Sequence, residues 1–432
     1  MRPTRPLLVL LVVLGLAGLL PLLGLASMME WGMLVAGVAL LAAVDALRLL
    51  RLPTPLARRV LPDALAVGVA REVEVALESR RRMRVDAFDL HPSGWQADDL
   101  PRRLQLQADS ITRFGYRLLP AARGRFLFEG VQLRLHAPWR LWTALRTAGV
   151  AQEVRVYPDF APLARLALFS AEQASLLVGA HLRRRRGEGT DFQQMREYRT
   201  GDSLRQVDWK ATARARKLIS REYQDERNQQ LLLVVDTGRR MLASEGGLSH
   251  FDHALNAALV VSWLALRQGD AVGLLATGAS TRWVQPRRGP GALQGLLRAS
   301  YDLQPATVAT DYLAMAEELA LRQRRRSLVM IATNVRDEDS EELLAAVRLL
   351  QRRHLVCVAS LRERVLDEAL AREVEDLPGA ITAGAVARYL EQRGQAHDAL
   401  RRQKVMTLDV AAADLPGALV ERYLAVKRDG LL

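Results

Sequence analysis

The sequence has little of the material from which metal and redox sites are usually built. Its 432 residues include seven histidines and one cysteine. A single thiol excludes an intramolecular disulfide, and so few imidazoles leave little for a zinc site. Cys357 lies in the apolar run 355–359, which is typical of a buried side chain rather than a nucleophile. No Gly-x-x-x-x-Gly-Lys-Ser/Thr loop is present, so we expect no ATPase activity from this chain.

Basic residues outnumber acidic ones, since 61 Lys and Arg against 48 Asp and Glu give a formal net charge of +13. This balance favours an acidic partner, a nucleic acid or an anionic membrane surface. The densest basic runs, 80–84, 183–186 and 322–326, are scattered and belong to no recognisable nucleic-acid-binding motif. We interpret them as solvated basic surface and expect no nucleic-acid partner.

Two long apolar runs occupy the N-terminal part, at 7–25 and 31–50. Each has about the 20 apolar residues that a membrane-spanning helix needs. The pair Ala26-Ser27 leaves a cleaved signal peptide as the alternative, but the second run follows at once. We therefore predict a transmembrane helical hairpin over residues 1–52.

The distribution of basic residues predicts the orientation of this hairpin. Arg2 and Arg5 precede the first run, Arg48 and Arg51 close the second, and the turn between the runs has no Lys or Arg. The positive-inside rule then places both ends of the hairpin in the cytoplasm. We expect a two-span protein of the inner membrane with soluble domains facing the cytoplasm. Asp45 is expected at the membrane interface beside Arg48, where Arg58 and Arg59 also favour anionic lipid.

Residues 53–160 alternate between apolar and polar side chains over 67–77, 103–107 and, less strictly, 126–135. A period of two residues is typical of half-buried strands. We predict a small β-sandwich of immunoglobulin-like size here.

From residue 229 to 432 the pattern alternates between strand-like and helix-like segments. The expected strands are 231–235, 271–276, 327–333, 354–360 and 405–410, and the expected helices are 251–266, 311–321, 340–352, 384–393 and 415–428. Such alternation predicts an α/β fold with a mostly parallel, doubly wound sheet. Ligands of such sheets bind at the carboxyl ends of the strands, so the turn after residue 235 is the first candidate site.

A connector, 161–228, joins these domains and holds the most distinctive stretch of the chain. Its residues resemble the signature of the bacterial domain-of-unknown-function 58 family. The matching positions are Arg196, Glu197, Tyr198, Gly201, Asp202, Arg205, Asp208, Trp209, Lys210, Thr212, Ala213 and Arg214. The order of parts is also similar to that family over nearly the whole chain, and the resemblance implies a von Willebrand factor A-like domain at the C-terminal end.

Closely spaced acids and bases in this signature allow two interpretations. One is an ion-pair network in which Arg196, Lys210 and their neighbours pair with nearby acids and attach the segment to the α/β domain. The other is a binding surface on which arginines grip an acidic partner loop. No Ser, Cys or His in the signature has an evident base beside it, so we expect no catalytic residue.

Von Willebrand factor A domains often bind a divalent cation through Asp-x-Ser-x-Ser, a later Thr and a later Asp. By this resemblance Asp236, Thr310 and Asn334 take the ligand positions, while Gly238 and Arg240 replace both serines. Magnesium prefers several oxygen ligands in octahedral array, and this set is depleted. We expect no cofactor, and expect Asp236 to pair with an arginine or to cap the next helix.

These observations predict a non-enzymatic, membrane-anchored interaction or assembly protein. The family resemblance implies a partner, because members are typically encoded with AAA ATPases of the MoxR group. Other membrane or envelope proteins and the lipid bilayer are further expected partners. A cell-envelope enzyme with its site at the top of the sheet, and a basic nucleic-acid-binding membrane protein, remain the alternatives.

Overall fold

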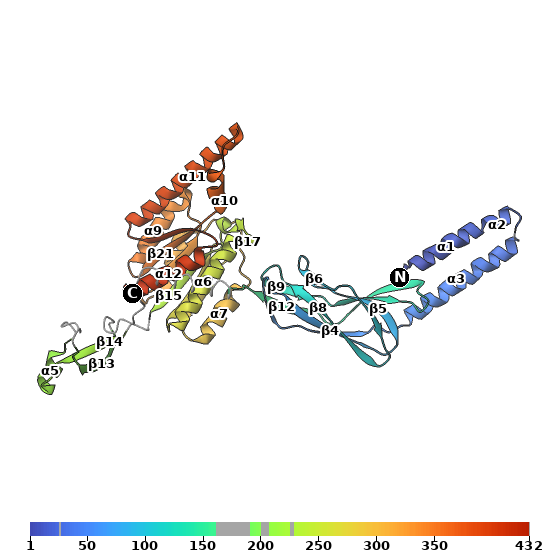
Figure 1. Ribbon diagram of the computed structural model, residues 1–432, viewed down its shortest axis with the longest axis horizontal. Helices are drawn as coiled ribbons and strands as arrows, with labels where there is room; N and C mark the ends of the chain where they lie inside the picture. Colours follow the sequence, from blue (N-terminus) through green and yellow to red (C-terminus); the bar gives the residue numbers. More distant parts are fainter. Residues whose placement is uncertain (26, 161–190, 200–206, 225–228, 432) are drawn as a thin grey trace. The chain divides into compact units, whose positions relative to one another are not determined.

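The computed structural model describes residues 1–25, 27–160, 191–199, 207–224 and 229–431. The chain divides into two compact units, residues 1–157 and 158–432 (Figure 1). Each is described by itself.

Unit 1 begins with apolar helices. After β1 (Arg2–Pro3) come α1 (Arg5–Ala17), α2 (Leu19–Leu22) and α3 (Met28–Leu50). The indole of Trp31 donates to the carbonyl of Leu14 over 3.3 Å, so α1 and α3 lie side by side (Figure 1). Only Met28–Leu50, among the described residues, is long and apolar enough to cross a membrane. The predicted first span, 7–25, is a shorter apolar helix over Arg5–Pro21, so the two-span hairpin stays a prediction.

Asp45, which the sequence places at the membrane interface beside Arg48, contacts the β-structure of unit 1. Its carboxylate is fully buried and accepts hydrogen bonds of 3.0 Å from the backbone N–H groups of Trp139 and Leu141. The guanidinium of Arg48 lies 4.6 Å from the ring centre of Trp139. The C-terminal part of α3 is therefore fastened to the β-structure of unit 1.

The rest of unit 1 is made of sheets around a common core, antiparallel except for the parallel pair β3 and β12, which agrees with the predicted sandwich-like domain. The sheet orders are β1-β11-β10-β5-β7, β2-β4-β8-β6 and β3-β12-β9. The strands are β2 (Leu56–Val60), β3 (Ala64–Ala66), β4 (Arg71–Ser79), β5 (Met83–Asp89), β6 (Gln96–Asp98), β7 (Arg102–Leu106), β8 (Ser110–Leu119), β9 (Gly124–Phe128), β10 (Val131–His136), β11 (Trp142–Ala148) and β12 (Gln152–Tyr157).

Two details of this unit differ from the predictions made from the sequence. The predicted strand 126–135 is two strands, β9 and β10, because Gly130 between them has a φ of +143°, which glycine adopts readily. Arg59 is not available to lipid, because its guanidinium is buried against the carboxylate of Asp89. The hydroxyl of Tyr116 also donates to Asp89, over 2.6 Å.

Unit 2 contains a six-stranded sheet in the order β19-β18-β15-β20-β21-β22. All neighbouring strands are parallel except the edge pair β18 and β19. The strands are β15 (Gln230–Asp236), β18 (Ala271–Thr277), β19 (Arg282–Arg287), β20 (Leu328–Thr333), β21 (Leu355–Arg362) and β22 (Met406–Ala411), with a short β16 (Ser244–Glu245) and β17 (Leu248–Ser249) pair beside them. The prediction missed β19, and with it the antiparallel edge.

Helices cover both faces of this sheet. Along β15, Leu231, Leu233 and Val235 join one apolar cluster, while Leu232 and Val234 join another. The first cluster contains α6 (His250–Arg267), α7 (Pro290–Ser300) and α12 (Leu415–Arg428); the second contains α8 (Tyr312–Arg322), α9 (Ser340–Gln351) and the end of α11 (Leu377–Arg402). This alternation explains why the central strands are continuous apolar runs.

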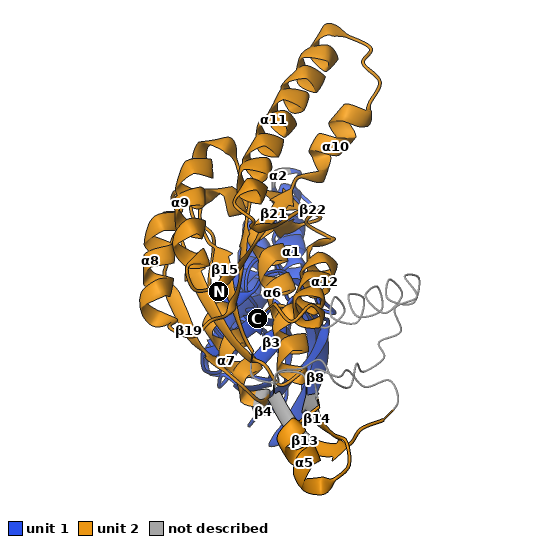
Figure 2. Ribbon diagram, turned by 90° about the vertical axis from the view of Figure 1, so that its left-hand side faces the viewer, with its two compact units in different colours: residues 1–157 blue, residues 158–432 orange. Residues whose placement is uncertain are grey.

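Two helices of unit 2 differ from the predictions made from the sequence. The expected helix 384–393 is part of a much longer helix, α11, and the helix α10 (Arg364–Ala371) before it was not predicted. Figure 2 shows α10 and the N-terminal part of α11 extending beyond the ends of β21 and β22. Unit 2 also contains the hairpin of β13 (Asp191–Glu197) and β14 (Ile219–Gln224), with α5 (Trp209–Ala215) between them in sequence.

Candidate functional site

The candidate site lies at the carboxyl ends of the central strands of unit 2. Asp236 ends β15 and is paired in register with Thr277 at the end of β18. On the other side, Val235 pairs with Ala332, one residue before Thr333 ends β20. Because these strands are parallel, their last residues meet at one edge of the sheet, where such folds place ligands.

Hydroxyl groups surround the carboxylate of Asp236, which is buried. Its Oδ1 accepts from the N–H of Gly238 over 2.7 Å and from the hydroxyl of Thr310. Its Oδ2 accepts from the hydroxyls of Thr333 over 2.7 Å and Tyr312 over 3.2 Å. Hydroxyls therefore hold this carboxylate, in place of the arginine that the sequence suggested.

The loop after Asp236 packs tightly against its neighbours. The hydroxyl of Thr237 donates to the carbonyl of Thr277 and accepts from the N–H of Ala279, both over 2.9 Å. At Gly238 a Cβ atom would lie 3.0 Å from Asp236 Oδ1 and would overlap the hydroxyl of Thr310. The serine of the cation-binding motif therefore has no room at this position.

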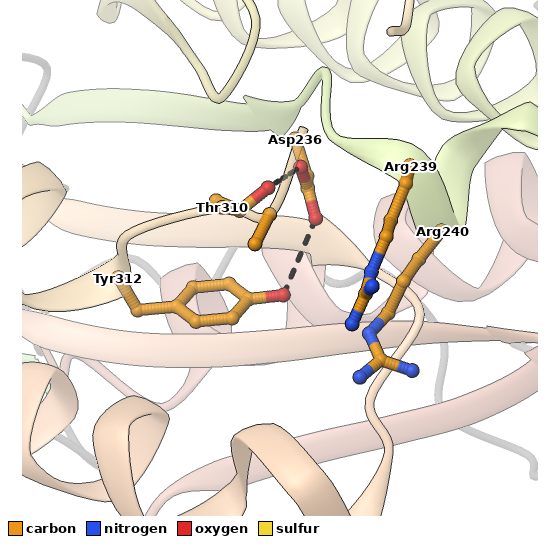
Figure 3. A pocket seen from close by; sticks show the side chains of 6 residues that line it. Asp236, Arg239, Arg240, Thr310 and Tyr312 are labelled. Atoms are coloured by element: carbon orange, nitrogen blue, oxygen red, sulfur yellow. Dashed lines mark hydrogen bonds between the residues drawn. The ribbon is translucent and has the colours of Figure 1, made fainter. Parts of the chain in front are cut away.

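Two arginines line the small hollow beside Asp236, which has room for about one water molecule and is also lined by Thr310 and Tyr312 (Figure 3). Arg239 and Arg240 belong to a short 3-10 turn, Arg239–Leu242, directly after β15. Both reach the carboxylate of Glu338, at 3.7 Å and 2.8 Å. The side chain of Arg240 is only 9% exposed, whereas that of Arg239 is 55% exposed.

Glu338 lies in the 3-10 turn Asp337–Asp339, ahead of α9. The carboxylate of Glu338 partly neutralises the arginine pair, and it is 63% exposed. The hollow therefore combines the buried carboxylate of Asp236, both of whose oxygens accept hydrogen bonds, with two arginines that contact the solvent-exposed carboxylate of Glu338.

Asn334, the third predicted ligand position, is held elsewhere. Its amide oxygen accepts from the guanidinium of Arg393 over 2.7 Å, and its amide nitrogen donates to Glu363 over 2.8 Å. Arg393 is itself buried and also donates to the hydroxyl of Ser360 and to Asp409. A cationic group of the protein thus occupies the ends of β20, β21 and β22.

The donor set around Asp236 does not fit a magnesium ion. Both carboxylate oxygens already accept hydrogen bonds, and the hydroxyls of Thr310 and Thr333 point their hydrogens toward them. Asn334 is turned to Arg393. Within the described ranges no three His, Cys, Asp or Glu side chains gather closely enough to hold a metal.

The described part of the family signature forms a small hairpin with its own hydrogen bonds. Asp208 caps α5, since its Oδ1 accepts from the N–H groups of Lys210 and Ala211 at 3.0 Å. The hydroxyl of Thr212 accepts from the N–H of Ile219 at the start of β14, over 3.0 Å. These polar residues thus fix the local turn between strand and helix.

Two other features of the signature differ from the predicted network. Glu197 pairs with Lys217 at 2.9 Å, a lysine that the sequence reading did not include. That contact raises the pKa of the exposed Lys217 amine. Trp209 is 65% exposed on α5. The predicted positions Gly201, Asp202 and Arg205, and the run 183–186, lie outside the described residues.

Several site residues were missed by sequence reasoning. Tyr312 follows the predicted Thr310 by two positions, so the start of α8 could have indicated it. Thr333 is the last residue of a predicted strand, and this position at the carboxyl end of the sheet could have indicated it. Arg393 had no usable signal, because 59 positions separate it from Asn334.

The fold and site together define a class: a mixed α/β domain with a polar hollow at its strand ends, joined to a β-structured unit that carries an apolar helix. The family follows from a comparison with family models. Residues 194–383 match the family described as "Protein of unknown function DUF58". This part of the chain belongs to that family, and the resemblance seen in the signature is confirmed.

Curated relatives are similar over part of their length. Uncharacterized proteins of Mycobacterium bovis and Mycobacterium tuberculosis are 30% identical over 162 residues, which is 37% of this chain and 51% of theirs. The chain therefore spans about half the length of the curated relatives it matches.

Solved structures give weak likenesses. An aerotolerance-related membrane protein from Bacteroides fragilis aligns with a TM-score of 0.28 and 13% identity, over 46% of this chain and 98% of that one. A fragment of alpha-2-macroglobulin from Escherichia coli aligns with a TM-score of 0.20 and 11% identity, over 25% of this chain and 17% of that one. Scores this low carry no argument about function.

Proposed function

We propose that this chain is a membrane-anchored, non-enzymatic interaction protein whose α/β unit binds a protein partner at the hollow beside Asp236. The observation that carries the proposal is that arginine side chains line this hollow, while its acid is buried and hydrogen-bonded. Asp236 is closed off by four hydrogen bonds, while Arg239 and Arg240 line the same hollow. Such a surface suits a carboxylate of a partner, which arginine can bind in bidentate geometry.

The order of the sheet supports a von Willebrand factor A-like domain. Counted along the chain, its six strands lie in the order 3-2-1-4-5-6, with the third antiparallel at one edge. Where such domains use a metal ion to bind an acidic group, this chain would use arginine side chains. Ser, Cys and His are absent from the described lining of the hollow, and its hydroxyls, those of Thr310 and Tyr312, donate to the buried carboxylate of Asp236.

The anchoring part of the proposal depends on α3. Met28–Leu50 has 23 residues and a mean hydropathy of 2.1 over its most apolar window. We infer that it spans a membrane, that α1 and α2 complete a hairpin, and that both units face the cytoplasm. The basic residues at both ends support this orientation. An ATPase of the MoxR group is the candidate partner that the family resemblance implies.

Affinity capture from native cells tests the proposal. The detergent-solubilised full chain is compared with Arg239→Glu, which reverses the exposed charge of the hollow. Arg298→Glu, on the exposed face of α7, is the matched control because it changes the net charge equally. Loss of one partner of a buried charge pair at an interface costs about 2–5 kcal/mol, largely because the other charge is left unpaired. We expect at least a tenfold loss of the captured partner with Arg239→Glu alone.

Two outcomes would contradict the proposal. Equal capture by the wild type and Arg239→Glu would show that the hollow is not the contact. Absence of any MoxR-type ATPase under nucleotide-trapping conditions would remove the candidate partner. A parallel Trp209→Ala variant asks whether the exposed indole of the signature is a second contact surface, since tryptophan is frequent among the residues that dominate binding energy.

A further inference from the structure

One end of the sheet in unit 2 is densely basic. β20 and β21 begin at Leu328 and Leu355, which are partners in register, so the residues before them lie at the same edge. The helices α8 and α9 end at Arg322 and Gln351, just ahead of these strands. We call the exposed cations between helix ends and strand starts the basic end: Arg324, Arg325, Arg326, Arg352, Arg353 and Lys404.

Helix dipoles account for only part of this cluster. A basic residue in the last turn of a helix is stabilised by the carbonyl end of that helix, and the effect fades beyond that turn. The six cations of the basic end lie past the last residues of α8, α9 and α11. Their proximity leaves like charges gathered on one surface, which favours an acidic ligand.

The opposite end of the same sheet carries an acidic arm, residues 364–392. It comprises α10 and the first four turns of α11, and no described side chain in it is buried. Residues 364–392 contain six acids and three arginines, so the arm is net acidic. Arg393 attaches the arm to the carboxyl ends of the strands through Asn334 and Ser360. Figure 2 shows the arm extending from that end.

Large apolar side chains are exposed among these acids. They are Val365 at 65%, Leu370 at 44%, Val374 at 53%, Leu377 at 73% and Ile381 at 64%. A contiguous exposed apolar patch on a soluble domain is typical of an interaction site. The arm is therefore suited to a partner that is both basic and partly apolar.

We propose that the acidic arm of one copy of this chain docks on the basic end of a second copy. The two surfaces have opposite charge and lie at opposite ends of one sheet. Leu321, which is 78% exposed beside the basic end, supplies an apolar contact for the arm. Because the two surfaces are different, the contact is head-to-tail, and it can repeat to form a row of copies.

A second copy explains more of the surface than an anionic lipid or a nucleic acid does. Phosphate groups would cover the basic end only. They would repel the acids of the arm and leave its apolar side chains exposed to water. Docking between copies covers both surfaces at once. It is also independent of the partner proposed at the Asp236 hollow, so either proposal can fail without the other.

Variants that reverse the charge of each surface test the proposal. The arm variant is Glu373→Lys with Glu375→Lys, and the end variant is Arg324→Glu with Arg352→Glu. All four side chains are exposed, and sedimentation velocity of the full chain in a non-ionic detergent measures self-association. We expect concentration-dependent assembly of the wild type in about 0.1 M salt that weakens in 1 M salt, because screening shortens from about 10 Å to 3 Å.

Each variant alone should assemble at least tenfold more weakly, because like charges then face each other. An equimolar mixture should recover assembly, since the reversed arm of one variant meets the reversed end of the other. A structural role of these residues would not restore assembly on mixing. With a mild added oxidant to accept the two electrons, a Leu377→Cys chain mixed with Leu321→Cys should also form a disulfide between copies, while the buried Cys357 does not react.

Three results would overturn the proposal. The first is a wild-type chain that stays monomeric at 100 µM, a concentration chosen for this assay to exceed ~10 µM binding, about −7 kcal/mol. The second is failure of the mixture to recover assembly while both variants keep wild-type circular dichroism. The third is binding of phosphatidylglycerol vesicles that is lost in the end variant, without any self-association, which would assign the basic end to lipid.

Discussion

The guanidinium of Arg393 donates a hydrogen bond of 2.7 Å to the amide oxygen of Asn334, at the position where a cation-binding relative would carry a ligand. The same guanidinium donates to the carbonyls of Val335 and Leu361, at 2.9 Å and 2.8 Å. One buried side chain of α11 thus joins three strand ends. The polar groups at this edge therefore satisfy one another around the buried guanidinium of Arg393.

Replacing Arg393 with alanine should destabilise unit 2 strongly. The change leaves Asn334, Asp409 and two carbonyls without their donor in a buried setting, and breaking a buried ion pair costs about 3–5 kcal/mol. Hydrogen exchange of the full chain should show lost protection along α11 and β22. The exposed Arg388→Ala on the same helix is the control and should change stability by less than about 0.5 kcal/mol. Equal protection in both variants would contradict this assignment.

Restoring the motif serine at Gly238 should not restore magnesium binding. A Cβ there overlaps the hydroxyl of Thr310 and crowds Val308 at 3.0 Å, so we expect Gly238→Ser to cost about 1–3 kcal/mol. Adding Thr310→Ala removes the nearest atom, and the double variant should be more stable than the sum of the single changes. Calorimetric titration should show no magnesium heat for Gly238→Ser. A heat of binding would show that the hydroxyls can turn away from Asp236.

Much of unit 2 could be predicted because its central strands are continuous apolar runs. α12 begins and ends where the pattern indicated, β15 is one residue longer at each end, and β20 begins one residue later than predicted. β19 was missed because Pro286 and three polar or basic residues obscure a strand that lies at an edge, where a proline is tolerated. Arg393 could not be assigned from sequence, because only the folded sheet brings it to Asn334.

Acid should weaken unit 2 through its buried histidines. Burial lowers the pKa of His250, His354 and His397 below the ordinary value of 6.5. The unfolded chain then binds protons more readily than the folded one, so stability is full above pH 6.5 and falls as the pH decreases below it. Thermal unfolding between pH 7.5 and 5, a range chosen to bracket a histidine pKa of about 6.5, measures the slope.

The variant His397→Gln should flatten this pH dependence. Within the described residues neither ring nitrogen of His397 has a hydrogen-bond partner, so little is lost with the imidazole at neutral pH. Gln395→Ala changes an exposed side chain of α11 that does not titrate, so it is the control and should keep the wild-type slope. An unchanged slope in His397→Gln would show that this ring is not among the groups that titrate on unfolding.

Asp45 should be required for the attachment of α3 to unit 1. Its carboxylate accepts from the N–H groups of Trp139 and Leu141, and charge-assisted hydrogen bonds of this kind contribute about 1.5–3 kcal/mol. Asp45→Ala should therefore increase hydrogen exchange at 137–143 in the detergent-solubilised chain. Glu78→Gln, an exposed acid of β4, serves as the control. Unchanged exchange in Asp45→Ala would mean that the turn is held by other contacts.

The proposed orientation in the membrane can be tested with single introduced cysteines. Cys357 is buried, and burial raises the pKa of its thiol to about 12, so the native chain should resist thiol reagents. Met29→Cys places a thiol in the exposed first turn of α3, and Arg388→Cys places one on exposed α11. In intact cells a membrane-impermeant reagent should label only Met29→Cys. Labelling of Arg388→Cys instead would place the α/β unit outside the cytoplasm and reverse the proposed topology.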